Sequence, residues 1–325
     1  MPWAWPQPTE VSRARDKVLQ AEKVYAEAVE AQATNDFELA TKKSEQARAL
    51  LEEARGYFEK ADVESHGTPE EAVDYVRLLN RLGDFDLAEK VLIPVLQRYP
   101  DKGELWLALG QVLSGMGEKR FGDAIQALQR ATETVAEDSA SSTAFASLGL
   151  QYFRQNLYDM AVESANKALE FNPNQSAAKM ILAGIDLRNG KVVEAAAVFD
   201  QQSENPQAIA AIQVILPQAL EAFDTVRQWF PDTAENHFAF ARLLIRANRM
   251  QECAMALERS LQLDPSNYMA WNMAGGVYHQ LNQIDRAIAA YRKSLEIKPD
   301  QDRTRQVIQQ LEGQARQPSA QPNLP

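Results

Sequence analysis

Apolar and small residues recur at alternating spacings of three and four along two stretches near the start of the chain. The first stretch runs from Val11 to Ala28 and the second from Phe37 to Ala61. This spacing lines one stripe of a helix and is the signature of a heptad pattern. Because the break between the stretches is short, two long helices should fold back on each other. The pattern predicts an antiparallel helical hairpin over residues 10–65.

A different regularity begins after this hairpin. Thr68, Pro69 and Glu71 have the order of an N-cap, a first helical residue and the closing residue of a capping box. Further on, three segments share one order of small, leucine, polar, bulky apolar, polar and proline residues: ALEFNPN at 168–174, SLQLDPS at 260–266 and SLEIKPD at 294–300. Proline ends a helix, and the last two segments are 34 residues apart. The spacing predicts a repeated helix–turn–helix unit.

The last unit carries the most complete motif. Its residues are separated by 4, 3, 9, 4 and 8 positions: Trp271, Gly275, Tyr278, Ala287, Tyr291 and Pro299. This order resembles the tetratricopeptide repeat (TPR), in which each 34-residue repeat folds as helix A, a turn and helix B. Looser copies start near residues 69, 103, 142 and 234. The resemblance implies an all-α, right-handed TPR-type solenoid over residues 66–300.

The spacing is irregular in the middle of the array. The segment 176–233 is 58 residues long, which is shorter than two regular 34-residue repeats. We therefore expect two shortened hairpins there. Pro217 is expected to open the second helix of the second hairpin, leaving its first helix short. The alternative is one kinked helix over 206–230. At the end of the chain, residues 301–313 are expected to form a capping helix.

Both chain ends have a composition that differs from the array. Residues 1–9 are expected to be a flexible segment, in which Trp3 and Trp5 pack back on the hairpin or the first repeat. Residues 314–325 are rich in Gln and Pro and are expected to be disordered.

Composition and charge narrow the class of protein. The 325 residues are 45% hydrophobic and carry a net charge of -11, which repels nucleic-acid phosphates, so we expect no nucleic-acid partner. No apolar run is long enough for a membrane span. The single cysteine, Cys253, excludes an intramolecular disulfide and takes the small position that Ala287 fills one repeat later. We therefore expect a cytoplasmic protein, although a signal sequence that had been removed would leave no trace.

No motif for catalysis, a metal or a cofactor is found. The three histidines are far apart in the sequence, and no CxxC pair, phosphate-binding loop or hydrolase serine motif occurs. We expect no enzyme activity, no cofactor and no catalytic or metal-binding residues.

The resemblance implies a site on the surface instead. In TPR proteins, helix A lines a concave groove, and its positions in this chain give these candidates: Phe153, Arg154, Met180, Ile181, Arg188, Phe238, Arg242, Arg246, Asn272, Met273 and His279. Four of them are arginines, which can clamp carboxylates with two hydrogen bonds. Either the groove takes a peptide with acidic and apolar residues, or the arginines pair with acids of the array. The lysine and asparagine positions of the chaperone-binding carboxylate clamp are not matched.

These observations favour a protein–protein interaction scaffold or adaptor that binds a peptide or partner protein in the groove. The alternative is a structural subunit or assembly factor of a multiprotein complex. In that case the protein would self-associate or dock through the N-terminal hairpin.

Overall fold

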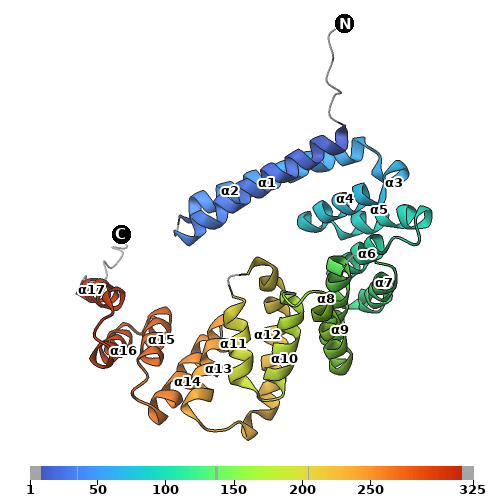
Figure 1. Ribbon diagram of the computed structural model, residues 1–325. Coiled ribbons are helices and arrows are strands. Elements are labelled where there is room, and N and C mark those ends of the chain that lie inside the picture. Colours follow the sequence, from blue (N-terminus) through green and yellow to red (C-terminus); the bar gives the residue numbers. More distant parts are fainter. Residues whose placement is uncertain (1–8, 35, 136–137, 204, 317–325) are drawn as a thin grey trace, which may run out of the picture. The chain divides into compact units, whose positions relative to one another are not determined.

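The computed structural model describes residues 9–34, 36–135, 138–203 and 205–316. Within these ranges every regular element is a helix, and the chain divides into two compact units, residues 1–175 and 176–325 (Figure 1). The expected all-α architecture is therefore confirmed. Trp3 and Trp5, most of the expected flexible segment at 1–9 and the last nine residues of the chain lie outside the described residues.

The first unit begins with the long hairpin and continues with three helix pairs. Its helices are α1 (Glu10–Ala33), α2 (Phe37–Lys60), α3 (Val63–His66), α4 (Pro69–Leu82), α5 (Phe85–Arg98), α6 (Gly103–Gly115), η1 (Glu118–Arg120), α7 (Phe121–Thr134), α8 (Asp138–Arg154) and α9 (Tyr158–Phe171). The second unit holds α10 (Ser176–Arg188), α11 (Val192–Gln201), α12 (Pro206–Val226), η2 (Arg227–Trp229), α13 (Ala234–Arg246), α14 (Met250–Leu263), α15 (Tyr268–Gln280), α16 (Ile284–Ile297) and α17 (Asp302–Arg316).

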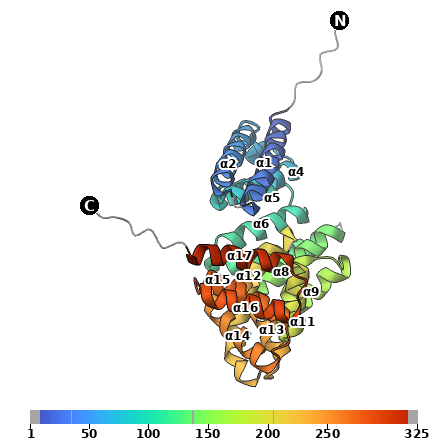
Figure 2. The ribbon, with the colours of Figure 1, turned by 90° about the vertical axis from the view of Figure 1, so that its left-hand side faces the viewer.

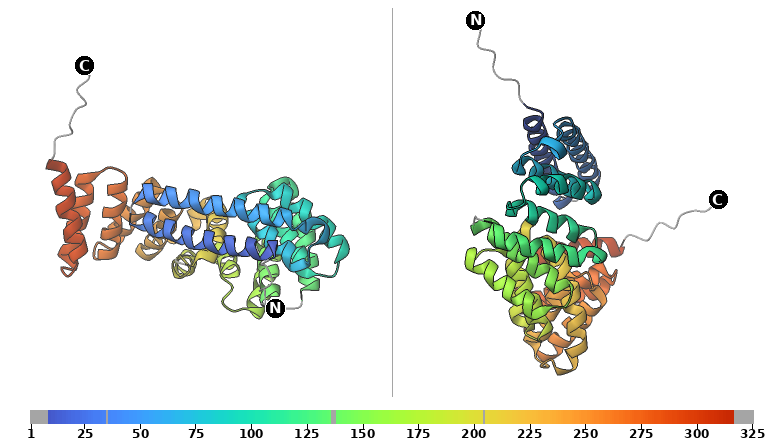
Figure 3. Two further views of the ribbon diagram at one scale, coloured as in Figure 1. Left: turned by 90° about the horizontal axis from the view of Figure 1, so that it is seen from above. Right: turned by 90° about the vertical axis from the view of Figure 1, so that its right-hand side faces the viewer.

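The helices α1 and α2 lie side by side along their whole length, as the sequence predicts (Figures 1 and 3). Their seam is made of buried alanines spaced by heptads, among them Ala14, Ala21, Ala28, Ala47 and Ala54. Small side chains let the two helix axes approach closely. The hairpin therefore gains little apolar burial per residue and depends on its neighbours at the base.

Two capping residues define the start of these helices. Thr9 caps α1 by accepting a hydrogen bond from the Ser12 backbone N–H, and Asp36 caps α2 in the same way from Leu39. The capping box predicted for Thr68 is present, with its hydroxyl and the Glu71 carboxylate each accepting a backbone hydrogen bond. These contacts satisfy N–H groups that the first turn of a helix leaves unpaired.

The turn between helix A and helix B uses one conformation in five hairpins. A residue with positive φ follows each helix A: Gly83, Asn156, Gly190, Asn248 and Asn282, with φ between 56° and 84°. Only glycine and asparagine enter this left-handed region at low cost. The turn therefore reverses the chain in two or three residues and leaves the two helices side by side.

Hydrogen bonds at equivalent repeat positions join helix B to helix A of one hairpin, and helix A to the segment that precedes it. Ser260 and Ser294, which are 34 residues apart, donate to the carbonyl oxygens of Ala234 and Tyr268 at 2.8 and 2.9 Å. The indole N–H of Trp271 donates to the Pro265 carbonyl at 2.9 Å, and the corresponding Trp106 bonds to Pro100. The TPR motif thus specifies hydrogen bonds as well as apolar packing.

Of the two alternatives for residues 206–233, the structure has the single helix rather than the shortened hairpin. Pro217 lies inside one continuous helix, α12, which ends at Val226 and is followed by the 3-10 turn η2. Buried side chains on both sides of Pro217, including Ile215 and Ala219, hold the helix through the proline. The packing therefore outweighs the cost of one lost backbone hydrogen bond.

The capping helix α17 is longer than expected, because it continues to Arg316. It lies against α16 (Figure 2) and buries Ile308 and Leu311. Residues 314–316, expected in the tail, are thus helical. The side chain of Thr304 donates to Asn272 of α15, so α17 is fastened to the last repeat by polar contacts too.

The substitutions Gly275→Ala and Gly276→Ala should have opposite effects on stability. A Cβ atom at Gly275 would lie 2.7 Å from the Tyr291 ring, whereas one at Gly276 would lie 3.6 Å from the Tyr291 hydroxyl, which is an ordinary contact. Both changes favour the helix by about 1 kcal/mol, but the first adds an overpacking cost of about 1–3 kcal/mol. Urea unfolding should give the order Gly276→Ala, wild type, Gly275→Ala from most to least stable. The reverse order would contradict the close approach of α15 and α16.

Cys253 should be unreactive in the folded protein. Its thiol is fully buried and donates to the Ala241 carbonyl at 3.2 Å, and burial raises its pKa to about 12. At pH 8 the thiol is therefore protonated and inaccessible, so a thiol reagent should label the chain only after denaturation. Met255→Cys is the control, since that side chain is 63% exposed and should react at once. Rapid labelling of native Cys253 would refute this assignment.

Candidate functional site

Three of the apolar groove candidates do not face solvent. Phe153, Met180 and Ile181 are each fully buried, so their side chains offer no surface to a ligand. The expectation that these three line an open groove is therefore not met. Phe153 and Arg154 belong to the first unit, and the other nine candidates belong to the second.

Met180 and Ile181 lie on α10, which packs against both α11 and α12. The helix α12 lies along α10, and the Asn205 side chain just before it donates to Ser176 at the start of α10 at 2.6 Å. Every residue of α10 is buried or half-buried, as in a helix that packs against several neighbours. At the end of α10, Arg188 keeps a partly exposed side chain that bonds to Asn189 at 3.4 Å.

Arg154, in the first unit, is held by groups of its own array. Its guanidinium donates to the Ser114 carbonyl at the end of α6 at 3.3 Å and lies 5.6 Å from the centre of the Phe121 ring. Burial lowers its pKa. A carbonyl at a helix C-terminus carries partial negative charge, so it suits a cation. Arg154 therefore has a structural role that the sequence did not reveal.

Arg242 and Arg246 form the strongest local concentration of positive charge on α13. They are one helical turn apart and both reach Asp200 of α11, with Arg242 on one carboxylate oxygen and Arg246 on the other. The Nε atom of Arg246 lies 3.1 Å from that second oxygen. Phe238 lies one turn earlier, and its ring centre is 5.9 Å from the Arg242 guanidinium. The side chains of the arginine pair are 27–28% exposed.

The charges at this pair do not balance. Among the residues that the structure describes, Asp200 is the one carboxylate within ion-pair distance of either arginine. Burial lowers the pKa of both guanidinium groups, and repulsion from Arg246 lowers that of Arg242 further. Both stay charged at neutral pH because an arginine pKa starts above 12. One positive charge and several N–H donors are thus left without an acidic partner in the described part of the chain.

The sequence missed Asp200, which is the central acceptor of this site. It stands 42 residues before Arg242 on helix B of an earlier repeat, and nothing in the local pattern distinguishes it from other surface acids. Arg242 and Arg246 thus do pair with an acid of the array, as one of the two alternatives expected, but they share a single carboxylate.

The candidates on α15 divide into two kinds. Asn272 bonds to Gln301 and accepts from Thr304 at 3.3 Å, so it fastens α17. Met273 is partly exposed and His279 is exposed. These two side chains remain available on the surface of the second unit.

The other titratable groups give no sign of a metal centre. His66 pairs with Asp62 at 2.9 Å and His237 with Asp232 at 2.8 Å, each within five residues of its partner. Over the described ranges, no group of three or more His, Cys, Asp or Glu side chains could hold a metal ion. Over the same ranges, no helix is long and apolar enough to cross a membrane.

Two curated proteins have sequences similar to part of this chain. A human protein named protein O-mannosyl-transferase TMTC1 is 24% identical over 212 residues, which are 61% of this chain and 23% of that protein. Tetratricopeptide repeat protein 37 of Xenopus laevis is 43% identical over 61 residues, 19% of this chain and 4% of that protein. The chain therefore spans less than a quarter of the length of either curated relative.

Among solved structures, that of yeast Tom70 is similar to this chain. The two are 16% identical, the match covers 96% of this chain and 66% of that chain, and the TM-score is 0.42. A tetratricopeptide repeat protein from Parabacteroides merdae has 13% identity, with 90% and 98% of the two chains covered and a TM-score of 0.42.

Models of the tetratricopeptide repeat match residues 69–112, 146–209 and 238–302, which together make up more than half of the chain. The matched segments omit the N-terminal hairpin and most of α12. They include the helices that carry the repeat-spaced hydrogen bonds and the left-handed turns described above. The chain belongs to the tetratricopeptide repeat family.

Proposed function

We propose that this protein is a scaffold or adaptor that binds an acidic segment of a partner protein at the Arg242–Arg246 pair. TPR proteins generally mediate protein–protein interactions, and the TPR fold is typically non-enzymatic. The observation that carries the proposal is the sharing of one carboxylate by two arginines. A partner carboxylate would supply the missing negative charge.

The chemistry of the pair favours a carboxylate over other ligands. Each guanidinium has five N–H donors in a planar arrangement that fits carboxylate oxygens. Partial burial keeps water from screening the interaction fully, which raises its strength relative to a fully exposed ion pair. Phe238 and Met273 are partly exposed and belong to helix A of two successive repeats. They are the apolar side chains that we propose for contact with the rest of the bound segment.

The location of the protein is part of the same proposal. A single, buried cysteine fits a reducing compartment, for which we propose the cytoplasm.

A second role is supported by a separate observation. The far half of the N-terminal hairpin carries large apolar side chains in contact with solvent, including Phe37, which is 62% exposed. Exposed apolar surface of this kind marks interaction sites. We propose that the hairpin docks or self-associates, as a subunit of an assembly would.

The arginine pair should select acidic peptides. The assay measures binding of fluorescent peptides that differ only in carboxylate content. The double variant Arg242→Gln, Arg246→Gln should bind the acidic peptides at least about tenfold more weakly, because charge-assisted hydrogen bonds are lost. Asp200→Asn should have the opposite effect and tighten binding, since the competing carboxylate in the chain is removed. Both effects should shrink as salt is raised.

The control removes two exposed cations elsewhere, Arg130→Gln with Lys167→Gln, and so changes the net charge by the same amount. Circular dichroism and unfolding midpoints establish that each variant is folded. If Asp200→Asn leaves the affinity for acidic peptides unchanged while folded, the pair is purely structural and the proposal fails.

A further inference from the structure

The base of the N-terminal hairpin is fastened to α4 by two ion pairs with equal sequence separation. Arg15 bonds to Asp74 at 2.6 Å and Arg81 to Glu22 at 2.7 Å. α1 and α4 therefore run side by side in the same direction. Because α4 ends at Leu82, one residue after the second ion pair, the part of the hairpin beyond residue 23 has no α4 beside it.

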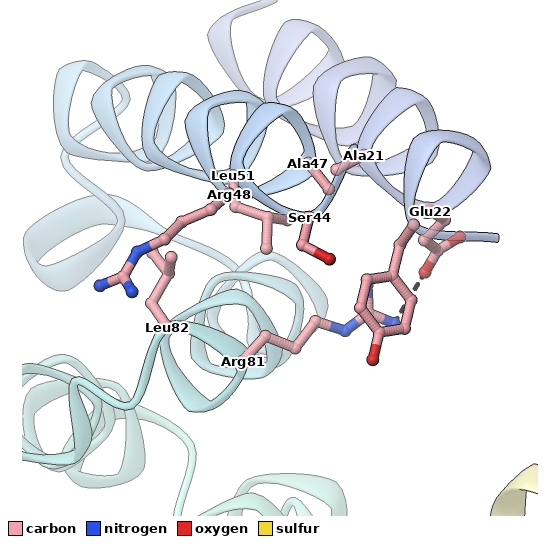
Figure 4. A pocket seen from close by; sticks show the side chains of 9 residues that line it. Ala21, Glu22, Ser44, Ala47, Arg48, Leu51, Arg81 and Leu82 are labelled. Atoms are coloured by element: carbon pink, nitrogen blue, oxygen red, sulfur yellow. Dashed lines mark hydrogen bonds and ion pairs between the residues drawn. The ribbon is translucent and has the colours of Figure 1, made fainter. Parts of the chain in front are cut away.

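A hollow of about 520 Å³ lies where α4 ends (Figure 4). Its floor is the alanine seam of the hairpin, with Ala21 and Ala47, and its walls include Leu51 of α2 and Leu82 of α4. Tyr25 of α1 also lines it. The small seam residues leave the room that larger side chains would have filled. The hollow is therefore apolar inside and sized for a few large side chains.

The apolar lining continues as a stripe toward the tip of the hairpin. Val29 stands one heptad after Glu22 on α1, and Phe37 stands one heptad before Ser44 on α2, so both share a face with the lining of the hollow. They are 51% and 62% exposed. A helix face with this apolar exposure lacks a partner within the described part of the first unit.

Charge differs sharply between the two ends of this stripe. Residues 24–41, around the tip, contain four acids and no Lys, Arg or His, but Lys23, Lys42 and Lys43 flank this range and Lys43 pairs with Glu27 at 2.5 Å. The hollow instead carries Arg48 and Arg81 at its rim. Arg81 is paired with Glu22, but no carboxylate among the described residues lies within ion-pair distance of Arg48. Among the described residues, Glu30, Asp36 and Glu38 at the tip and Arg48 at the rim of the hollow are therefore the charges that have no ion-pair partner.

We propose that a second copy of this chain binds here, with the tip of each hairpin seated in the hollow of the other. In this two-fold arrangement, Phe37 of one copy fills the hollow beside Leu51 and Leu82, and its neighbour Glu38 pairs with Arg48. The end of α4 stops the tip from sliding further. This inference specifies the self-association offered above as the second role, and it is independent of peptide binding at α13.

The charges favour a second copy in this orientation over a parallel one. An antiparallel pair brings each acidic tip to a basic rim, whereas a parallel pair would bring the two acidic tips together. The same contact is made twice in a two-fold dimer, so each Arg48–Glu38 pair and each buried Phe37 counts twice. The four helices would then bury the stripe as a short four-helix bundle.

Sedimentation equilibrium of the full chain over a range of concentrations tests the dimer. The average mass should rise from that of one chain to that of two. Phe37→Glu should weaken association at least about tenfold, because the side chain at the centre of the contact is lost. Met255→Glu is the matched control, since its side chain is 63% exposed on α14 and should have no effect.

Charge reversal tests the contact in particular. Arg48→Glu and Glu38→Arg should each be monomeric at concentrations where the wild type dimerises, because each puts like charges together. A mixture of the two variants should form a heterodimer, since both of its Arg48–Glu38 sites then hold opposite charges. These substitutions lie on the exposed hairpin surface, and circular dichroism verifies folding.

Three results would overturn the inference. A wild type that stays monomeric at the highest concentration has no such dimer. A dimer that survives Phe37→Glu is formed elsewhere, and a mixture of charge variants that stays monomeric shows that Arg48 and Glu38 do not meet. Acidic-peptide binding measured on the same samples is a separate readout, so failure of one proposal does not count against the other.

Discussion

The close approach of helix A to helix B at a few small positions is the constraint on which the array depends. At Gly275 the Tyr291 ring occupies the place of a side chain, and at Ser294 a hydroxyl reaches the first carbonyl of the partner helix. Larger residues at either position would separate the helices and break the contacts that the rest of the hairpin makes. The left-handed Gly or Asn in the turn is needed for the same reason, because it reverses the chain without a spacer.

The helix α12 changes which side chains of the second unit are exposed. A regular array leaves one face of each helix A open, but α12 lies along α10 and encloses it. Positions that would contact a ligand in a regular repeat, such as Met180, become core positions here. Of the groove candidates in the second unit, those on α10 before Arg188 are buried, whereas Phe238, Arg242, Arg246, Met273 and His279 on α13 and α15 keep exposed or half-buried side chains.

The sequence predicted well where one repeat determines its own structure. Gly275 acts within a single hairpin and Trp271 bonds to Pro265 at the end of the preceding repeat, so both act over the short range that the repeat spacing records. Prediction failed where a partner lies on another repeat, and it stayed open where packing outweighs a local preference. Asp200 acts on a residue 42 positions away. For Pro217 the sequence left a helix start and a single helix open, and buried neighbours on both sides select the single helix α12. Neither effect leaves a periodic trace in the sequence.

Arginine alone is therefore a poor indicator of a binding site in this array, and charge balance is a better one. Arg154 is satisfied by a helix C-terminus and an aromatic ring, so it needs no ligand. At Arg242 and Arg246, and again at Arg48, the cations outnumber the carboxylates within reach among the described residues. A partly buried cation that lacks a full partner loses hydration without regaining it from the protein. An acidic group from another chain restores that balance at Arg242 and Arg246. Arg48 is exposed and stays hydrated, so an acidic partner there adds a surface ion pair and the apolar contact of Phe37 must supply most of the binding.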